Sequence, residues 1–283
     1  MNVGLLIAEC GLSKRVSNLF DLRSKIPHSE FRNKKMNRYS IGSVVGVILL
    51  WEALVRGFNI PKFLLPAPST IASYIIAKFH LFAFHTSTTL LEAGTGFVIG
   101  SVLAILTAVL FLWFRPLKEM FYPYAVILNS TPIVAIAAPI VIIFGSDMWS
   151  KVITAIICVF FPVLGPTFKA LASTGGTEMK WMDSYAASRW QKFRFLQFPA
   201  ALPQMFASFK VAWTLAVIGA VVGEVFGAYR GLGFLIVDAI YIMDTPRVFA
   251  SILACSLLGL SFVGIITLIE RRTIGWHTSL ERR

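Results

Sequence analysis

The stretch TLLEAGTGFVIGSVLAILTAVLFLW, residues 89–113, carries one charged side chain, Glu92, and is otherwise dominated by apolar residues. A helix needs about 20 mostly apolar residues to cross the roughly 30 Å of hydrocarbon in a bilayer. This stretch therefore predicts a membrane-spanning helix, and the rest of the chain can be compared with it.

Five further segments have the same character. Only 14% of the 283 residues are charged and 57% are hydrophobic, and the mean hydropathy is +0.74. A soluble domain has about 25% charged residues. The predicted fold class is therefore an all-α polytopic membrane protein with about six transmembrane helices over residues 39–271. Besides the second span at 89–113, they cover about 39–58, 119–144, 149–171, 204–228 and 248–269.

The segments outside these spans are assigned by composition. Residues 1–38 are polar and basic, and we expect a disordered cytoplasmic extension, with Met1 or Met36 as the start of translation. Residues 272–283 are expected to form a cytoplasmic tail. The segment 63–85 is either an amphipathic interfacial helix or a seventh span.

The distribution of positive charge predicts the orientation. With a cytoplasmic N-terminus, 20 of the 26 Lys and Arg residues face the cytoplasm and six face outward. Cytoplasmic loops carry an excess of these residues, so N-in, C-in is favoured. The net charge of +12, which would suggest nucleic acid in a soluble protein, is accounted for by topology, and no nucleic-acid partner is expected.

The longest cytoplasmic loop, about residues 172–203, lies between spans four and five. Its segment EMKWMDSYAASRWQKFRFLQ has no Gly or Pro and is predicted to form one or two short helices. Pro199 and Pro203 are expected to end this run, with Pro203 in the first turn of the fifth span. One interpretation is a solvated loop whose charges only set topology; another is a surface covered by a partner.

Residues 187–236 resemble the matching region of ABC-importer permeases of the nitrate/sulfonate/taurine type. The motifs that carry the resemblance are ASRWQKF, FPAALPQMFASFKVAWTLAVIGAVVGE and GLGFLI. The resemblance extends to STPIVAIAAPIVIIFG and LIERRTIGWH and covers nearly the whole chain from about residue 40. It implies a coupling helix that docks on a cytosolic ATPase, with Trp190 as its anchor. Ala186 stands where the family pattern usually has Gly. The residues carried over are Met182, Asp183, Ser184, Tyr185, Ala186, Ala187, Ser188, Arg189, Trp190 and Lys192.

The resemblance also implies the partners and the function. Two permease copies would form one path in the bacterial inner membrane, an ATPase dimer would bind ATP and Mg²⁺, and a periplasmic binding protein would deliver the solute. The solute would be a small organic anion, nitrate, or a vitamin precursor such as a thiamine pyrimidine. The alternative is a secondary transporter or channel that does not use ATP.

No catalytic site or metal site is predicted, and no cofactor is expected on this chain. The sequence has no GxxxxGK[ST] phosphate loop and no HExxH motif. We therefore expect that the chain is not an enzyme. The energy for transport would come from ATP hydrolysis by the partner ATPase.

Polar residues within the spans are candidates for a translocation path, because they are costly in lipid. These candidates are Asn129, Ser130, Thr131, Pro132, Trp213 and Thr214; the alternative is ordinary helix–helix packing. Gly219 and Gly223 allow close helix approach and predict either an interface between two copies or packing within one subunit. Glu224 is expected near the outer mouth, where the plain alternative is a carboxylate facing water.

Overall fold

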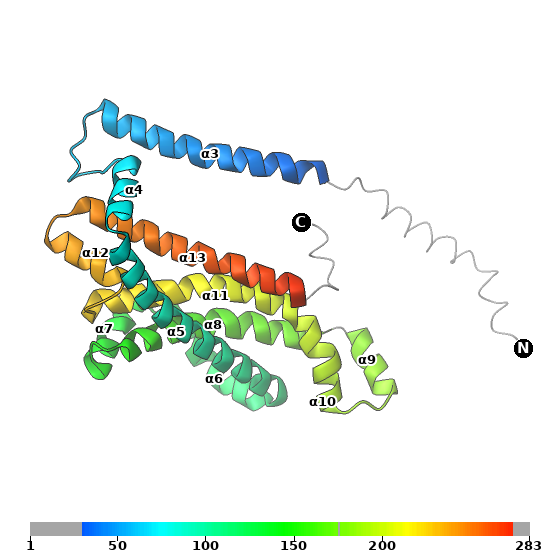
Figure 1. The fold of residues 1–283 in the computed structure, drawn as a ribbon. Helices are drawn as coiled ribbons and strands as arrows, with labels where there is room; N and C mark the ends of the chain where they lie inside the picture. The colour runs from blue at the N-terminus through cyan, green and yellow to red at the C-terminus, as the bar shows by residue number, and fades with distance from the viewer. Residues whose placement is uncertain (1–29, 175, 274–283) are drawn as a thin grey trace, which may run out of the picture. The chain divides into compact units, whose positions relative to one another are not determined.

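The computed structural model describes residues 30–174 and 176–273, and every regular element in that part of the chain is helical (Figure 1). Within it, α3 up to Leu50 belongs to one compact unit and the chain from Trp51 onward to a second. Residues 1–29 and 274–283, which hold most of the predicted extension and tail, lie outside the described residues. The elements are α3 (Glu30–Gly57), α4 (Pro68–Ala77), α5 (Phe79–Trp113), α6 (Arg115–Ser130), α7 (Ile133–Phe144), α8 (Met148–Ala172), α9 (Gly176–Ser184), α10 (Arg189–Lys192), the π-helical turn η1 (Phe193–Gln197), α11 (Phe198–Gly227), α12 (Leu232–Tyr241) and α13 (Thr245–Thr273).

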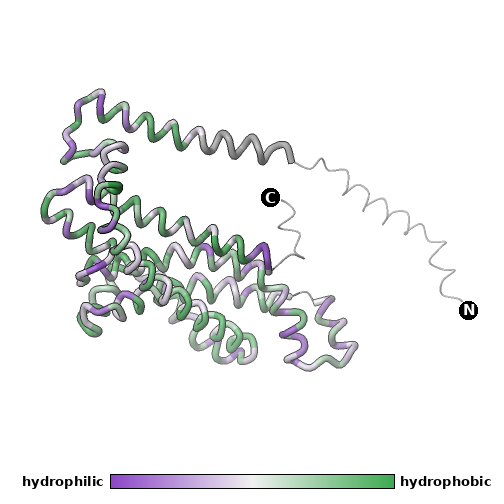
Figure 2. Tube along the Cα trace, in the orientation of Figure 1, coloured by the Kyte–Doolittle hydropathy of each residue, from purple (hydrophilic) through white to green (hydrophobic). Residues whose placement is uncertain are grey.

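The prediction of an all-α polytopic membrane protein is confirmed. Four helices of the described chain are long and apolar enough to cross a membrane: α5, α8, the continuous helix Arg189–Gly227, and α13. Figure 2 shows apolar residues along most of their length. The predicted first span lies within α3, so its helical state is confirmed, while its crossing of the membrane stays a prediction.

The third predicted span, about residues 119–144, is apolar enough to cross a membrane but is broken near its middle. It consists of α6 and α7, which meet at an angle of 98°. Thr131, the residue before Pro132, has an extended backbone (ψ 130°), because a proline disfavours the helical conformation of the residue that precedes it. Pro123 and Pro139 lie inside α6 and α7 without ending them.

The core of the second unit forms where α8 packs against both α5 and α11. Small residues make this close approach possible. A Cβ atom on Gly96 of α5 would lie 2.5 Å from the Cβ of Ala155, and one on Gly219 of α11 would lie 2.9 Å from the Sγ of Cys158. Without a hydrophobic driving force between helices in lipid, such close van der Waals packing stabilises the bundle.

An aromatic stack joins α11 to α13. The Trp213 indole lies 4.0 Å from the Phe262 ring, centroid to centroid, with the two planes nearly parallel. Phe97 of α5 contacts the same indole edge-on at 5.6 Å. Three of the long helices are thus packed around one tryptophan.

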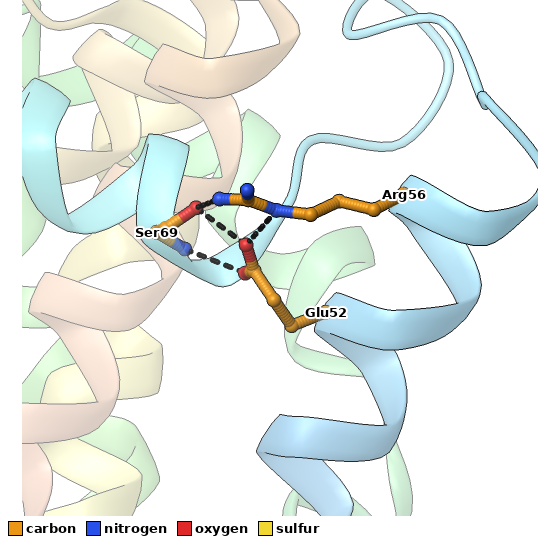
Figure 3. A network of polar contacts seen from close by, with 3 residues as sticks. All are labelled: Glu52, Arg56 and Ser69. Carbon is orange, nitrogen blue, oxygen red and sulfur yellow. Dashed lines mark hydrogen bonds and ion pairs between the residues drawn. The ribbon is translucent and has the colours of Figure 1, made fainter.

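The segment 63–85 contains no separate span. It holds α4, which with 10 residues is too short to cross a bilayer, and the first turns of α5. Glu52, in the last turns of α3, accepts hydrogen bonds from the Ser69 backbone N–H (3.0 Å) and the Ser69 hydroxyl (2.7 Å), and it pairs with Arg56 at 2.6 Å (Figure 3). The carboxylate therefore satisfies one of the free N–H groups at the start of α4, that of Ser69.

Candidate functional site

The cytoplasmic segment predicted from the sequence forms a helical hairpin. It comprises α9, a turn at residues 185–188, and α10. The Ala186 N–H donates to the Asp183 carbonyl (2.9 Å), and the Ala187 N–H donates to the Met182 carbonyl (3.0 Å). Ala186 has a φ of +52°. These bonds and the left-handed residue define a Schellman motif, the usual way in which a helix ends at a glycine.

The turn keeps this shape although an alanine occupies the position where the family pattern has Gly. A left-handed conformation costs an L-residue roughly 1–2 kcal/mol, because its Cβ approaches the following carbonyl. The two backbone hydrogen bonds offset part of that cost. The turn therefore forms with alanine at position 186, and this residue adds strain to it.

Two side-chain interactions close the hairpin. Ser188 and Gln191 form a reciprocal capping box at the start of α10: the Gln191 backbone N–H donates to the Ser188 hydroxyl, and the Ser188 backbone N–H donates to the Gln191 side-chain oxygen Oε1 (2.8 Å). Lys192 of α10 forms an ion pair with Asp183 of α9. The capping box therefore fixes the start of α10, and the ion pair fixes its last residue, Lys192, to α9.

An aromatic chain connects the hairpin to the membrane helices. Trp190 lies 6.3 Å from Trp113, the last residue of α5, and 5.6 Å from Phe193, centroid to centroid. Phe193 is buried and also contacts Phe198 at the start of α11. A displacement of α10 would therefore act directly on the ends of α5 and α11.

The surface of the hairpin remains unusually apolar for a segment outside the spans. Tyr185 at the tip is 84% exposed and Trp190 is 54% exposed, and Trp181 and Phe195 are exposed as well. Of the ten predicted coupling residues, only Met182, Ala187 and Lys192 are half-buried, and the others are exposed. Trp190 therefore packs against Trp113 with part of its ring, and about half of its surface stays exposed.

The prolines after the hairpin do not end the helical run, which corrects the prediction from the sequence. The helix continues from Arg189 to Gly227 through η1, where the Phe198 N–H donates to the Phe193 carbonyl five residues earlier. Pro199 lies in the first turn of α11, and Pro203 lies inside that helix. A widened π-type turn accommodates such a break in the regular hydrogen-bond pattern.

The candidate path residues occupy two different environments. Asn129, Ser130, Thr131 and Pro132 lie at the break between α6 and α7 and are exposed in the described chain. Trp213 is fully buried in the stack against Phe262, and Thr214 beside it is half-buried. The packing of Trp213 favours a structural role, and its place in a path stays a prediction.

The surroundings of Gly219 and Gly223 in α11 favour packing within one subunit over an interface between two copies. A Cβ on Gly219 would also lie 2.9 Å from the Ala155 Cα, and one on Gly223 would lie 3.2 Å from the Lys151 Cα. Both glycines therefore face α8 of the same chain. The interface between copies that was predicted for them is not supported by this packing.

Glu224 does not face water, so the simple interpretation of an interfacial carboxylate is wrong. It is 1% exposed and accepts hydrogen bonds from the Thr89 hydroxyl (2.7 Å) and the Gly233 N–H (2.6 Å). Gly231, with φ +107°, leaves the space that this carboxyl group occupies. Glu224 thus joins α5, α11 and the N-terminus of α12. Sequence reasoning missed Thr89 and α12, because nothing local links them to Glu224.

Comparison with known proteins identifies the family of the chain. Residues 96–275 match the family described as the binding-protein-dependent transport system inner membrane component. The formylaminopyrimidine transport permease protein of Halalkalibacterium halodurans is 33% identical over 232 residues, which are 82% of this chain and 92% of that protein. The riboflavin transport system permease protein of Chloroflexus aurantiacus is 31% identical over 235 residues, covering 82% and 88%. A putative aliphatic sulfonates permease of Bacillus subtilis is 26% identical over 269 residues, covering 90% and 95%.

The fold and these matches define a membrane transport subunit rather than an enzyme. The chain belongs to the binding-protein-dependent transport system inner membrane component family and is the permease subunit of an ABC importer, a multi-pass protein of the bacterial inner membrane. Family membership excludes the alternative of a transporter or channel that is independent of ATP. It also implies an ATPase and a substrate-binding protein as partners.

Proposed function

We propose that the hairpin of α9, the turn at Ala186 and α10 is the surface on which the cytosolic ATPase docks, and that ATP and Mg²⁺ are bound by that partner. The observation that carries the proposal is a segment with exposed aromatic side chains that contacts the ends of α5 and α11 through Trp190 and Phe193. Aromatic residues near the centre of an interface are typical hot spots of binding energy.

Rigidity is what a coupling segment requires. To shift a two-state path from 1:99 to 99:1, about 5.5 kcal/mol of differential binding must reach the membrane helices. A loose loop would lose that free energy in its own motions. The capping box at Ser188 and the ion pair between Lys192 and Asp183 both oppose such motion.

The change Trp190→Ala tests the docking surface. We expect the variant to insert into the membrane normally and to lose ATPase affinity by about 2 kcal/mol or more, roughly thirtyfold, because a half-exposed aromatic anchor is removed. Co-purification with the ATPase and its stimulated hydrolysis in proteoliposomes measure this. Trp149→Ala, another exposed tryptophan but at the start of α8, is the matched control. Normal ATPase association of the Trp190 variant would contradict the proposal.

We further propose that two copies of the chain line one path. The irregular backbone at Thr131 and Pro132 supports this, because non-helical backbone at membrane depth is tolerated only where protein or a water-filled cavity covers it. In the described chain these residues are exposed. A second copy facing the break would supply the cover and the opposite wall of the path. Cross-linking between cysteines introduced at Asn129 in two copies is expected, and its absence in assembled transporters would contradict this arrangement.

For the solute, we propose a heteroaromatic vitamin or vitamin precursor rather than a sulfonate. The supporting observation is that relatives at 33% and 31% identity are named for formylaminopyrimidine and riboflavin, whereas those named for sulfonates and taurine are 26% and 23% identical. Uptake of radiolabelled formylaminopyrimidine, riboflavin and taurine by the complete transporter in proteoliposomes tests this. Uptake of taurine alone would contradict it.

A further inference from the structure

A pocket of about 490 Å³ lies where α5 ends and α6 begins, with α9 and α10 on its other side. Trp113 and Phe114 line it at the end of α5, and Met179 lines it from α9. Three cationic side chains, those of Arg115, Arg189 and Lys192, line it as well. The pocket therefore combines apolar walls with positive charge.

Two of these three charges are left without a partner. Lys192 is paired with Asp183. Arg115 and Arg189 form no ion pair or side-chain hydrogen bond within the part of the chain that the structure describes. No Asp or Glu lines the pocket. Two guanidinium groups in one pocket make a site for an anion, and their planar forks suit the oxygens of a phosphate group.

The apolar walls and the position of the pocket identify the kind of anion. Tryptophan is enriched where membrane helices leave the hydrocarbon, and Trp113 is the last residue of α5. A small soluble anion has no use for the walls formed by Trp113, Phe114 and Met179. An amphiphile with a phosphate head and an apolar body matches both halves of the pocket, and basic pockets on the cytoplasmic side of membrane helices are known to suit anionic lipid headgroups.

We propose that this pocket binds one anionic phospholipid, with its phosphate held by Arg115 and Arg189 and its glycerol and first methylenes against Trp113 and Phe114. The bound lipid then braces α10 against the end of α5. The binding site is argued from the pocket alone. Any effect of the lipid on ATPase docking would rest, in addition, on the proposed function.

The test is native mass spectrometry of the full-length permease titrated with phosphatidylglycerol and, separately, with phosphatidylcholine. We expect preferential retention of one phosphatidylglycerol. In the double variant Arg115→Gln/Arg189→Gln, the affinity for this lipid should fall at least tenfold, from about 1 kcal/mol per basic residue near the surface. Arg194→Gln, which removes one positive charge outside the pocket, should change the affinity less than about twofold, because Arg194 lacks the direct charge-assisted contact with the bound phosphate.

Further measurements distinguish this proposal from its alternatives. Thermal unfolding checks that the double variant is folded, and Arg115→Lys/Arg189→Lys should recover part of the binding because the charge returns without the fork. An equal loss in Arg194→Gln would overturn the proposal in favour of unspecific surface charge. Displacement of the lipid by equimolar glycerol phosphate would overturn it in favour of a soluble anion. Unchanged lipid binding with lost ATPase binding in the double variant would assign the pocket to the ATPase and overturn it too.

Discussion

At the scale of single residues, Ala186 carries the main cost in the hairpin. Its left-handed φ is needed because the Schellman motif reverses the chain between α9 and α10. Asn59 and Met243 are the two other non-glycine residues with positive φ in the described chain, and they occupy the same place in similar helix ends. The chain therefore uses this motif repeatedly and without glycine.

Replacing Ala186 with glycine should relieve the strain. We expect Ala186→Gly to stabilise the turn by about 0.5–1 kcal/mol, the left-handed cost of alanine less the extra unfolded-state entropy of glycine. Amide hydrogen exchange at residue 187, whose N–H bonds to the Met182 carbonyl, should slow accordingly. Ala187→Gly, next to it and without a positive φ, is the control and should not slow exchange. Faster exchange in Ala186→Gly would contradict the account of strain.

The hydroxyl group of Tyr74 in α4 should ionise at a higher pH than an ordinary tyrosine. Its hydroxyl donates to Asp244 at 2.5 Å, and burial, followed by this hydrogen bond, raises the pKa of Tyr74 from 10.0 to about 12. A raised pKa means that the folded state holds the proton more tightly, so this contribution to stability is complete below pH 10 and is lost as the pH rises towards 12. Ultraviolet titration of the wild type minus Tyr74→Phe should show a tyrosine that ionises near pH 12. A midpoint near 10 would contradict the hydrogen-bonded, partly buried geometry.

At the scale of elements, α8 is the helix against which α5 and α11 are assembled. Gly96 and Gly219 allow its two neighbours to approach, and Glu224 joins the C-terminal end of α11 to α5 and α12. The break at Thr131 turns one expected span into two helices. Contacts between distant segments, rather than local preference, decide each of these features.

The packing of α11 on α8 can be tested at Gly219. Gly219→Ala should destabilise the fold by about 1–3 kcal/mol, because the new Cβ would lie 2.9 Å from Cys158 and Ala155 and would separate the helices. Gly264→Ala in α13, where nothing lies within 4 Å of the added Cβ, should be neutral or stabilising. Thermal unfolding in detergent measures both. If the Gly219 variant kept its stability but changed its oligomeric state, the result would instead support an interface between two copies at Gly219.

At the scale of the whole molecule, the continuous helix from Arg189 to Gly227 leads from the hairpin to the opposite end of the bundle. The charge count predicts a cytoplasmic hairpin, and α11 leads from it to α12 at the other end of the bundle. If this is right, Tyr185 and Tyr241, both more than 80% exposed, lie on opposite sides of the membrane.

Cysteine labelling tests that topology. In a background without the native cysteines, Tyr185→Cys should react with an impermeant maleimide only in inverted vesicles, and Tyr241→Cys only in right-side-out cells, because positive charge is retained in the cytoplasm. Labelling of both from the same side would contradict the orientation. Membrane permeabilisation, which should expose both sites, is the control.

Much of the molecule could be predicted from the sequence because the relevant physics is local. Runs of apolar residues define α5, α8 and α13 to within a few residues at most of their ends, since the cost of exposed backbone in lipid forces such runs into helices. The one marked difference is the start of α5, which extends ten residues before the predicted span. The exposed aromatic hairpin was also predictable, from its composition and its resemblance to a family.

Other features could not be read locally. Whether Pro132 breaks a helix while Pro123, Pro139 and Pro203 do not depends on what surrounds each one. Whether Gly219 faces a second copy or α8 depends on which helix lies against it, and the burial of Glu224 depends on Thr89, 135 residues away. The chain itself dictates which segments must be helical and apolar, because lipid leaves no other state for their backbone. The assembled bundle decides which faces meet, because that choice depends on contacts between residues far apart in the chain.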